Sequence, residues 1–167
     1  MANKTFLKVD NCLDSKQRTL VPLQVFGKHN LQNLQAARLV CRELGLSDGQ
    51  ILEAIQTFGG AAKRLETLAE TKKQTVFKDF AHAPSKVRAT VNAVKGQYAG
   101  RPLVAVLELH TFSSLNKEFM GGYQGAMDAA DVAFVYYNKH TLKMKKMPDI
   151  SPEEVADAFY HANMQVF

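Results

Sequence analysis

Two unbroken apolar runs in the second half of the chain constrain its fold more than any other feature. They are residues 102–109 (PLVAVLEL) and Val132–Tyr137 (VAFVYY), and polar residues hardly interrupt them. Strands of this composition are typical of parallel sheets, whose faces are covered by helices. Helical segments are expected between and after them, at 84–98, 116–130 and 151–163. The pattern therefore predicts an α/β fold: a Rossmann-like, mostly parallel sheet with helices on both faces.

The first 60 residues follow a different pattern. Their predicted elements are strands at 6–9 and 19–23 and helices at 30–44 and 49–58, the second helix opening with a Ser47–Gln50 capping box. Two strands cannot form a stable sheet alone, and a further strand opens at 164–167, next to the last residue. We therefore expect a truncated chain. Residues 1–60 would end one domain, Gly59 and Gly60 would form a hinge, and residues 61–167 would make most of the next domain.

Strands at 65–68 and 75–78 are expected at the start of the second domain. In open α/β sheets, ligands bind beyond the carboxyl ends of the strands, so the residues after each strand are the candidate site. No GxxxxGK[ST] or GxGxxG loop occurs in the sequence. The chain alone therefore lacks a loop that cradles phosphates.

Charge and cysteine content exclude little. The net charge is +5, but basic charge alone is a weak sign of nucleic-acid binding. The dense basic run at 139–146 (KHTLKMKK) lacks an aromatic residue and is interpreted as a solvated face. Cys12 and Cys41 lack metal-ligand spacing, and no signal peptide or run of 18 apolar residues is present. We expect a cytoplasmic protein that binds neither nucleic acid, membrane nor metal through these residues.

Asparagine and arginine side chains mark the first two candidate positions. Asn30 and Asn33 lie three residues apart, so both amides can project from one helix face toward a purine edge. Alternatively, Asn30 is an N-cap. Arg64 follows the glycine pair and can reach a phosphate with its planar fork, or it pairs with Glu66 on the surface.

Two further positions follow predicted strands. Asp79 can accept hydrogen bonds from ribose hydroxyls, and His82 can touch a phosphate or substrate; alternatively, Asp79 caps a helix and His82 packs on the surface. A polar cluster suited to a small polar ligand follows the strand at 102–109. Its members are Glu108, His110, Thr111 and Ser113.

Taken together, three motifs resemble the Mur ligase family. They are GKHNLQN (27–33), FGGAAKRLE (58–66) and KDFAHAP (78–84), in the family's order, and the likeness runs from about residue 27 to 130. The resemblance implies an ATP-dependent amide ligase of peptidoglycan synthesis or recycling, acting in cell-wall biogenesis, cell shape and division. The family activates a muramoyl carboxylate as an acyl-phosphate, which an amine then attacks.

The resemblance also implies roles for the candidate residues. Asn30 and Asn33 would meet adenine, Arg64 the phosphates and Asp79 the ribose. His82 would lie near the γ-phosphate or the incoming amine, and the cluster at 108–113 would bind substrate. The cofactors would be ATP and Mg²⁺. The magnesium ligands, the P-loop and the UDP-sugar domain would precede residue 1, so this chain alone is expected to be inactive.

Within the family, DFAH resembles most the recycling branch, which joins UDP-N-acetylmuramate to L-alanyl-γ-D-glutamyl-meso-diaminopimelate. That branch is expected to read EPRSNT where this chain reads ELHTFS (108–113), and the arginine is missing. LHTFS instead resembles the branch that adds L-alanine to UDP-N-acetylmuramate, which is the alternative.

Two other classes stay open. A stand-alone flavodoxin-like nucleotide-binding module would need a complete sheet and its own phosphate loop. An RNA-binding domain would bind through the basic run at 139–146 in a salt-sensitive manner.

Overall fold

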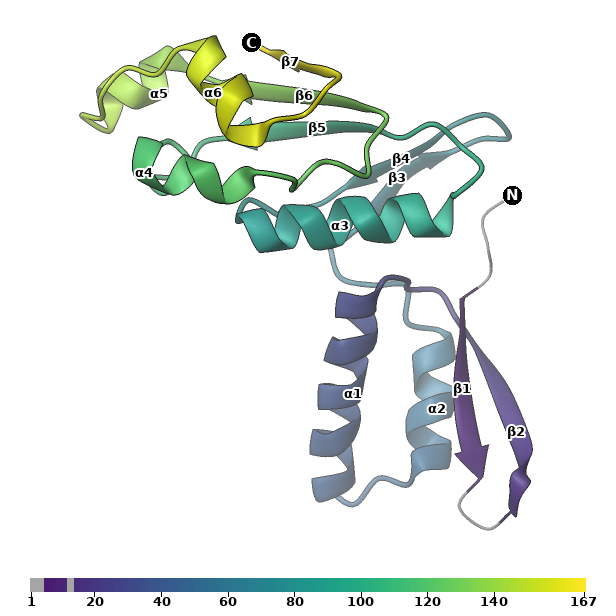
Figure 1. The fold of residues 1–167 in the computed structure, drawn as a ribbon. Coiled ribbons are helices and arrows are strands. Elements are labelled where there is room, and N and C mark those ends of the chain that lie inside the picture. The colour runs from purple at the N-terminus through teal and green to yellow at the C-terminus, as the bar shows by residue number, and fades with distance from the viewer. Residues whose placement is uncertain (1–4, 12–13) are drawn as a thin grey trace. The chain divides into compact units, whose positions relative to one another are not determined.

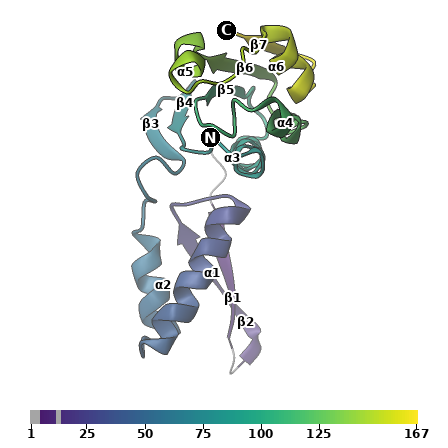
Figure 2. The same ribbon diagram turned by 90° about the vertical axis from the view of Figure 1, so that its left-hand side faces the viewer.

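The computed structural model describes residues 5–11 and 14–167, with the backbone alone for residues 8–11 and 14–19. Cys12 lies outside the described residues. The chain forms two compact units, Met1–Asp79 and Phe80–Phe167 (Figures 1 and 2). Within the described ranges, no helix has the length and apolar character needed to cross a membrane.

The first unit begins with a hairpin and two helices. β1 (Thr5–Asn11) and β2 (Asp14–Leu23) are antiparallel, with Thr5 opposite Leu23. They contain both predicted strands, and β2 also takes up the polar stretch between them. α1 (Lys28–Glu43) and α2 (Asp48–Gln56) follow. The predicted capping box is confirmed, because Ser47 accepts from the Gln50 N–H while the Gln50 side chain accepts from the Ser47 N–H.

The apolar side of α1 is not covered by the described residues. None of the residues of this helix is buried, and the apolar Val40 is 60% exposed. α2 contributes Ile51 to the interior, whereas Phe58, which follows this helix, is 48% exposed. The helical spacing therefore located the helices correctly but did not show how much of each face this chain covers.

A second hairpin completes the first unit. β3 (Glu66–Glu70) and β4 (Thr75–Lys78) are antiparallel, with Glu66 opposite Lys78. The Phe77 ring of β4 meets the Phe26 ring edge-on, with centroids 5.6 Å apart and an interplanar angle of 71°. This contact joins the hairpin to the segment between β2 and α1.

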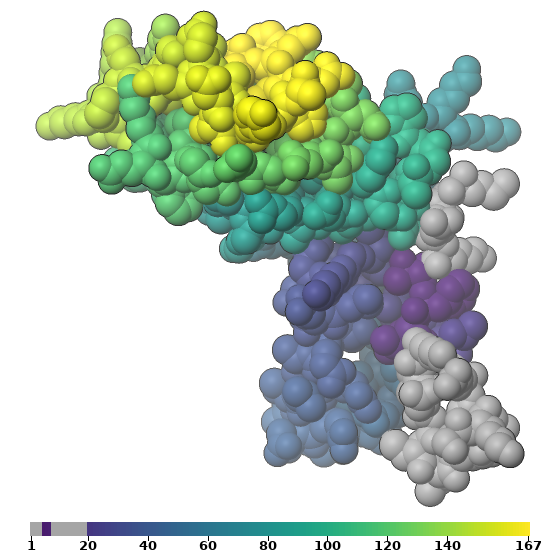
Figure 3. All heavy atoms as spheres, viewed as in Figure 1, coloured from purple at the N-terminus to yellow at the C-terminus, as the bar shows by residue number. Residues whose placement is uncertain are grey.

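The second unit is a parallel sheet flanked by helices, which confirms the α/β class. Its strands lie in the order β5-β6-β7, all parallel. The strands are β5 (Val104–Leu109), β6 (Val132–Tyr137) and β7 (Met164–Val166). The helices are α3 (Pro84–Gln97), α4 (Lys117–Met120), α5 (Lys139–Met144) and α6 (Pro152–Phe159). The atoms of α6 and β7 lie together in the space-filling view (Figure 3).

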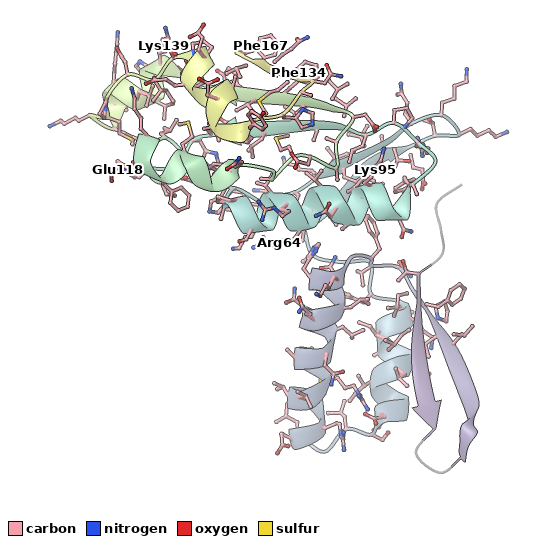
Figure 4. The ribbon with its side chains drawn as sticks, viewed as in Figure 1. Arg64, Lys95, Glu118, Phe134, Lys139 and Phe167 are labelled. Carbon is pink, nitrogen blue, oxygen red and sulfur yellow. The ribbon has the colours of Figure 1, made fainter. Side chains whose placement is uncertain are left out.

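The hydrophobic core lies on one face of this sheet. Leu109 and Val135 point into it and meet side chains from the helices, among them Val155 and Phe159 of α6. Alternate positions of the strands face the other way, and Val106 is 73% exposed. Phe134 and Phe167 lie near each other, with ring centroids 5.9 Å apart (Figure 4). The predicted burial of β5 on both faces is therefore not met by the described residues.

The helix expected over 116–130 is wrong in its length. A single helix was expected over 116–130, but α4 ends at Met120, a 3₁₀ turn (η1) covers Gly121–Tyr123, and turns follow. Glycine is a poor helix former, and Gly125 has a φ of 70°, which ends helical geometry. Lys139, Lys143 and Lys146 of the basic run are exposed, as expected of a solvated face, and the run also forms α5, which buries Leu142 completely.

Candidate functional site

The turn into α1 carries the asparagine pair. Gly27 is the N-cap, with a φ of 89°, and no side chain caps this helix end. The alternative role of Asn30 as N-cap is therefore wrong. Asn30 Nδ2 donates to the Phe26 carbonyl at 2.9 Å, which holds this half-buried side chain against the strand-to-helix turn. Asn33 lies one turn further along α1 and is exposed.

The same turn contains an unsatisfied polar atom. His29 Nδ1 is buried and has no hydrogen-bond partner among the residues that the structure describes. A buried nitrogen without a partner is costly, so a group from outside these residues is expected to satisfy it. His29 Nδ1 is thus the polar atom of this turn that the described residues leave unsatisfied.

Arg64 lies in a strained turn before β3. Its neighbours Lys63 and Leu65 have φ values of 55° and 49°, a region that non-glycine residues rarely occupy. Two side-chain carboxylates hold this turn. Glu66 Oε2 accepts from the Lys63 N–H and Asp79 Oδ2 accepts from the Leu65 N–H, each at 2.8 Å.

Neither alternative role for this turn is found in the part of the chain that the structure describes. The Glu66 carboxylate bonds to the Lys63 amide, and no ion pair between Glu66 and Arg64 is found among the described residues. Asp79 is not a helix cap, since Ala83 is the N-cap of α3. The exposed Arg64 side chain (Figure 4) thus starts from a turn that the Asp79 carboxylate fixes in place.

The four residues expected at a nucleotide belong to one compact unit, Met1–Asp79. Asn30 holds the Phe26 carbonyl, and the Phe26 ring packs on Phe77, two residues before Asp79. A continuous series of contacts therefore links the asparagine turn to the Asp79 carboxylate. Together these groups offer amide, carboxylate and guanidinium functions, which match a purine, a ribose and phosphates.

Two histidines meet in the second unit. The His82 and His110 ring centroids are 6.2 Å apart, and the His82 ring packs edge-on against Phe80 at 5.1 Å. His82 Nδ1 lies 3.0 Å from the Phe80 carbonyl and His110 Nδ1 lies 3.3 Å from the Glu108 carbonyl. Because a carbonyl only accepts, each Nδ1 is the donor, which leaves Nε2 with a lone pair in the neutral ring. Both imidazoles can therefore accept a proton at Nε2.

Hydroxyl groups form a compact turn after β5. Thr111 Oγ1 donates to Ser114 Oγ at 2.9 Å and lies 3.2 Å from Ser113 Oγ. Ser114 is buried and holds the turn, whereas Ser113 is exposed. Glu108 belongs to β5 and alternates with the buried Leu107 and Leu109, so its carboxylate lies on the exposed face of the sheet. The structure therefore groups His110, Thr111 and Ser113 but directs the Glu108 side chain elsewhere.

Two residues near the site had no signal in the sequence. The Tyr123 hydroxyl donates to the His82 carbonyl, across 41 positions of sequence. Burial raises the pKa of this phenol to about 12. The Lys145 Nζ lies 3.8 Å from the centre of the exposed Phe112 ring, a cation–π contact. Both pairs are distant in sequence, so a linear pattern could not have indicated them.

The described residues show no arrangement that would hold magnesium. In the parts of the chain that the structure describes, no group of three or more His, Cys, Asp or Glu side chains is arranged to hold a metal ion. The groups that remain suit an organic anion such as a nucleotide, together with proton transfer through imidazole.

Comparison with known proteins shows the family and the fold. The profile described as "Mur ligase, glutamate ligase domain" matches residues 63–167, more than half of the chain. A UDP-N-acetylmuramate–L-alanine ligase of Renibacterium salmoninarum is 33% identical over 142 residues, covering 85% of this chain and 30% of that protein. The chain thus spans about a third of the length of the curated relatives it matches.

Solved structures share the fold. The UDP-N-acetylmuramate–alanine ligase MurC of Thermotoga maritima superposes with a TM-score of 0.63 at 20% identity, covering 92% of this chain and 33% of that one. A murein peptide ligase of Psychrobacter arcticus gives a TM-score of 0.56 at 22% identity, covering 92% and 32%. Among the curated relatives, those of Renibacterium salmoninarum and Desulfitobacterium hafniense are both named L-alanine ligases, so the closeness expected to the recycling branch is not confirmed.

Proposed function

This chain belongs to the Mur ligase family, and we propose that it supplies part of the nucleotide site of an ATP-dependent amide ligase of peptidoglycan synthesis. The whole protein would act in the cytoplasm on UDP-N-acetylmuramate, ATP and an amino acid. One observation carries the proposal: the Asp79 carboxylate fixes the turn beside Arg64, and packed aromatic rings connect it to Asn30.

In this proposal the chain's own residues bind and orient the nucleotide. Asn30 and Asn33 would bond the adenine edge, Asp79 would accept from the ribose hydroxyls, and Arg64 would pair with phosphate oxygens. Bound ATP supplies the phosphoryl group that activates a carboxylate. Magnesium would be held by residues of the full-length protein outside this chain, since the described residues include no group arranged to hold a metal ion.

The second unit would handle the incoming amine. An ammonium group must lose a proton before its nitrogen can attack, and a neutral imidazole with a lone pair on Nε2 can accept that proton. His82 has this arrangement and is therefore assigned as the catalytic group. The exposed hydroxyls and imidazole of His110, Thr111 and Ser113 would bind the rest of the substrate.

For the amine, we favour L-alanine over the tripeptide of the recycling branch. The named relatives that are L-alanine ligases support this choice, as does LHTFS at 109–113. DFAH at 79–82 resembles the recycling branch instead, so the tripeptide stays the alternative amine. Supplying the purified full-length protein with ATP, UDP-N-acetylmuramate and either amine would decide between them. Faster ADP release with the tripeptide than with L-alanine would reverse the preference.

Replacing Arg64 by alanine tests the nucleotide site. Loss of a charge-assisted bidentate contact should lower kcat/KM for ATP by roughly 10- to 100-fold. Arg42, an exposed arginine at the end of α1, provides the matched control. Full activity of Arg64→Ala, or an equal loss in Arg42→Ala, would contradict the assignment.

A further inference from the structure

Tyr123 contacts the segment that carries His82, the assigned catalytic residue, but has no part in the proposed binding of nucleotide or amine. Its side chain is 0% exposed, and its hydroxyl donates to the His82 carbonyl. We propose that Tyr123 is a positioning residue: it fixes the peptide of His82, and thereby the direction and tautomer of the imidazole. The inference rests on the proposed function, in which His82 serves the incoming amine.

The Tyr123 ring is held on two sides. It stacks on Phe159 of α6, with centroids 4.8 Å apart and an interplanar angle of 16°, and it meets Phe119 edge-on at 6.3 Å. A ring packed in this way has one accessible rotamer, so the direction of its hydroxyl is set by the core. Its raised pKa, about 12, keeps the phenol protonated at neutral pH. The hydroxyl is therefore a permanent donor.

The turn that carries Tyr123 is anchored to two helices. Arg88 of α3 donates from Nη2 to the Gln124 carbonyl at 2.7 Å, and the Gly125 N–H donates to the Phe159 carbonyl at 3.4 Å. Gly122 lies so close to α3 that an added Cβ would stand 3.4 Å from the Pro84 side chain. The donor thus belongs to a rigid platform, as precise positioning of a functional group requires.

The hydrogen bond from the Tyr123 hydroxyl affects both the backbone and the ring of His82. It fixes the carbonyl of His82 itself, and the neighbouring bond from Nδ1 to the Phe80 carbonyl fixes the ring. The second bond forms only if the backbone of residues 80–82 keeps its conformation. Without the hydroxyl of Tyr123, that backbone can turn, and the bond that sets the Nδ1–H tautomer weakens. Nε2 would then carry the proton in part of the molecules and could not accept one.

A matched control exists in the same unit. The Tyr137 hydroxyl, also in a buried residue, donates to the Ile150 carbonyl at 2.9 Å. Tyr123→Phe and Tyr137→Phe therefore each remove one tyrosine-to-carbonyl bond and should lower the urea midpoint by similar amounts. Nitrogen-15 NMR of the imidazoles, at a pH where they are neutral, reports the tautomer. The His82 signals should move toward the mixed tautomers of free histidine in Tyr123→Phe and stay unchanged in Tyr137→Phe.

Kinetics of the full-length protein supply the second readout. Tyr123→Phe should lower kcat by roughly 10- to 100-fold at an unchanged KM for ATP, since misplacement of a reacting group acts on turnover. Tyr137→Phe should stay within about twofold of wild type. Unchanged His82 signals in Tyr123→Phe, or equal changes in both variants, would overturn the inference. If the wild-type protein forms no amide bond, the proposed function fails, while the NMR comparison still decides the role of Tyr123.

The wild-type protein offers a test if Tyr123→Phe does not fold. Deuterium on the Tyr123 hydroxyl should shift the carbon-13 resonance of the His82 carbonyl, because the hydrogen bond transmits the isotope effect. Absence of that shift would also overturn the inference.

Discussion

Replacing Asp79 by asparagine and by alanine should separate the two tasks proposed for its carboxylate. Oδ2 accepts from the Leu65 N–H at 2.8 Å and holds Leu65 at a φ of 49°. Asparagine keeps an acceptor oxygen of the same shape but loses the charge. Alanine removes the acceptor, so the turn beside Arg64 loses this bond altogether. The turn should therefore survive in Asp79→Asn and loosen in Asp79→Ala.

The structure sets the size of both effects. A hydrogen bond to a charged acceptor contributes about 1.5–3 kcal/mol, and half-burial of Asp79 places it at the low end. Asp79→Ala should thus lower the free energy of unfolding by about 1–2 kcal/mol and Asp79→Asn by less than about 1 kcal/mol. If the same carboxylate also bonds the ribose, loss of that bond in Asp79→Ala should raise the KM for ATP by roughly 10-fold or more. Asp79→Asn keeps a neutral hydrogen bond and should raise it by only a few-fold.

Urea denaturation of this chain measures the first effect, and ADP release against ATP concentration in the full-length protein measures the second. The expected order is wild type, Asp79→Asn, Asp79→Ala in both assays. An unchanged KM for ATP in both variants would refute the contact with the nucleotide. Equal destabilisation by the two variants would refute the role of the oxygen acceptor in holding the turn.

Three further outcomes are expected in this chain. Leu109→Ala should lower the free energy of unfolding, measured by calorimetry, by about 2–5 kcal/mol, because Leu109 is 1% exposed in the core. A smaller loss would contradict tight packing around this side chain. Gly60→Ala should cost about 1–2 kcal/mol, because Gly60 has a φ of 101°, and an unchanged urea midpoint would contradict this. The hydrogen bonds from Lys95 and from the Leu103 N–H lower the pKa of Asp131 from 3.8. The ionised carboxylate should therefore stabilise the fold above pH 3.8, and this contribution should be lost as the pH falls through the lowered pKa. In Asp131→Asn, the free energy of unfolding should depend less on pH in this range.

Local signals in the sequence located most of the elements correctly. Helical spacing and the Ser47 capping box gave α2, and the unbroken apolar runs gave β5 and β6 in parallel. These features depend on neighbours within a few residues, which a linear pattern contains. The alternation of strand and helix was enough to establish the fold class.

Errors arose where tertiary contacts outweigh local preference. The expected helix over 116–130 ended early because Gly121, Gly122 and Gly125 allow a tight turn that brings Tyr123 to His82. The apolar run of β5 indicated burial on both faces, yet a pattern cannot say whether the covering residues lie within the same chain. Motif positions were found, whereas the contacts that hold them, such as Asp79 with Leu65, were not.

The pairing of the strands also bears on how the chain folds. β1 with β2 and β3 with β4 are hairpins, formed between residues close along the chain. In the second unit, Val104 must find Val132 and Ala133 must find Met164, each pair separated by a whole crossover helix or turn. Loop-closure entropy opposes such long-range contacts, so units of this kind fold more slowly than units built from local pairs. During synthesis, the hairpins and helices of the first unit would therefore form before β6 can pair with β5 and before β7 can pair with β6.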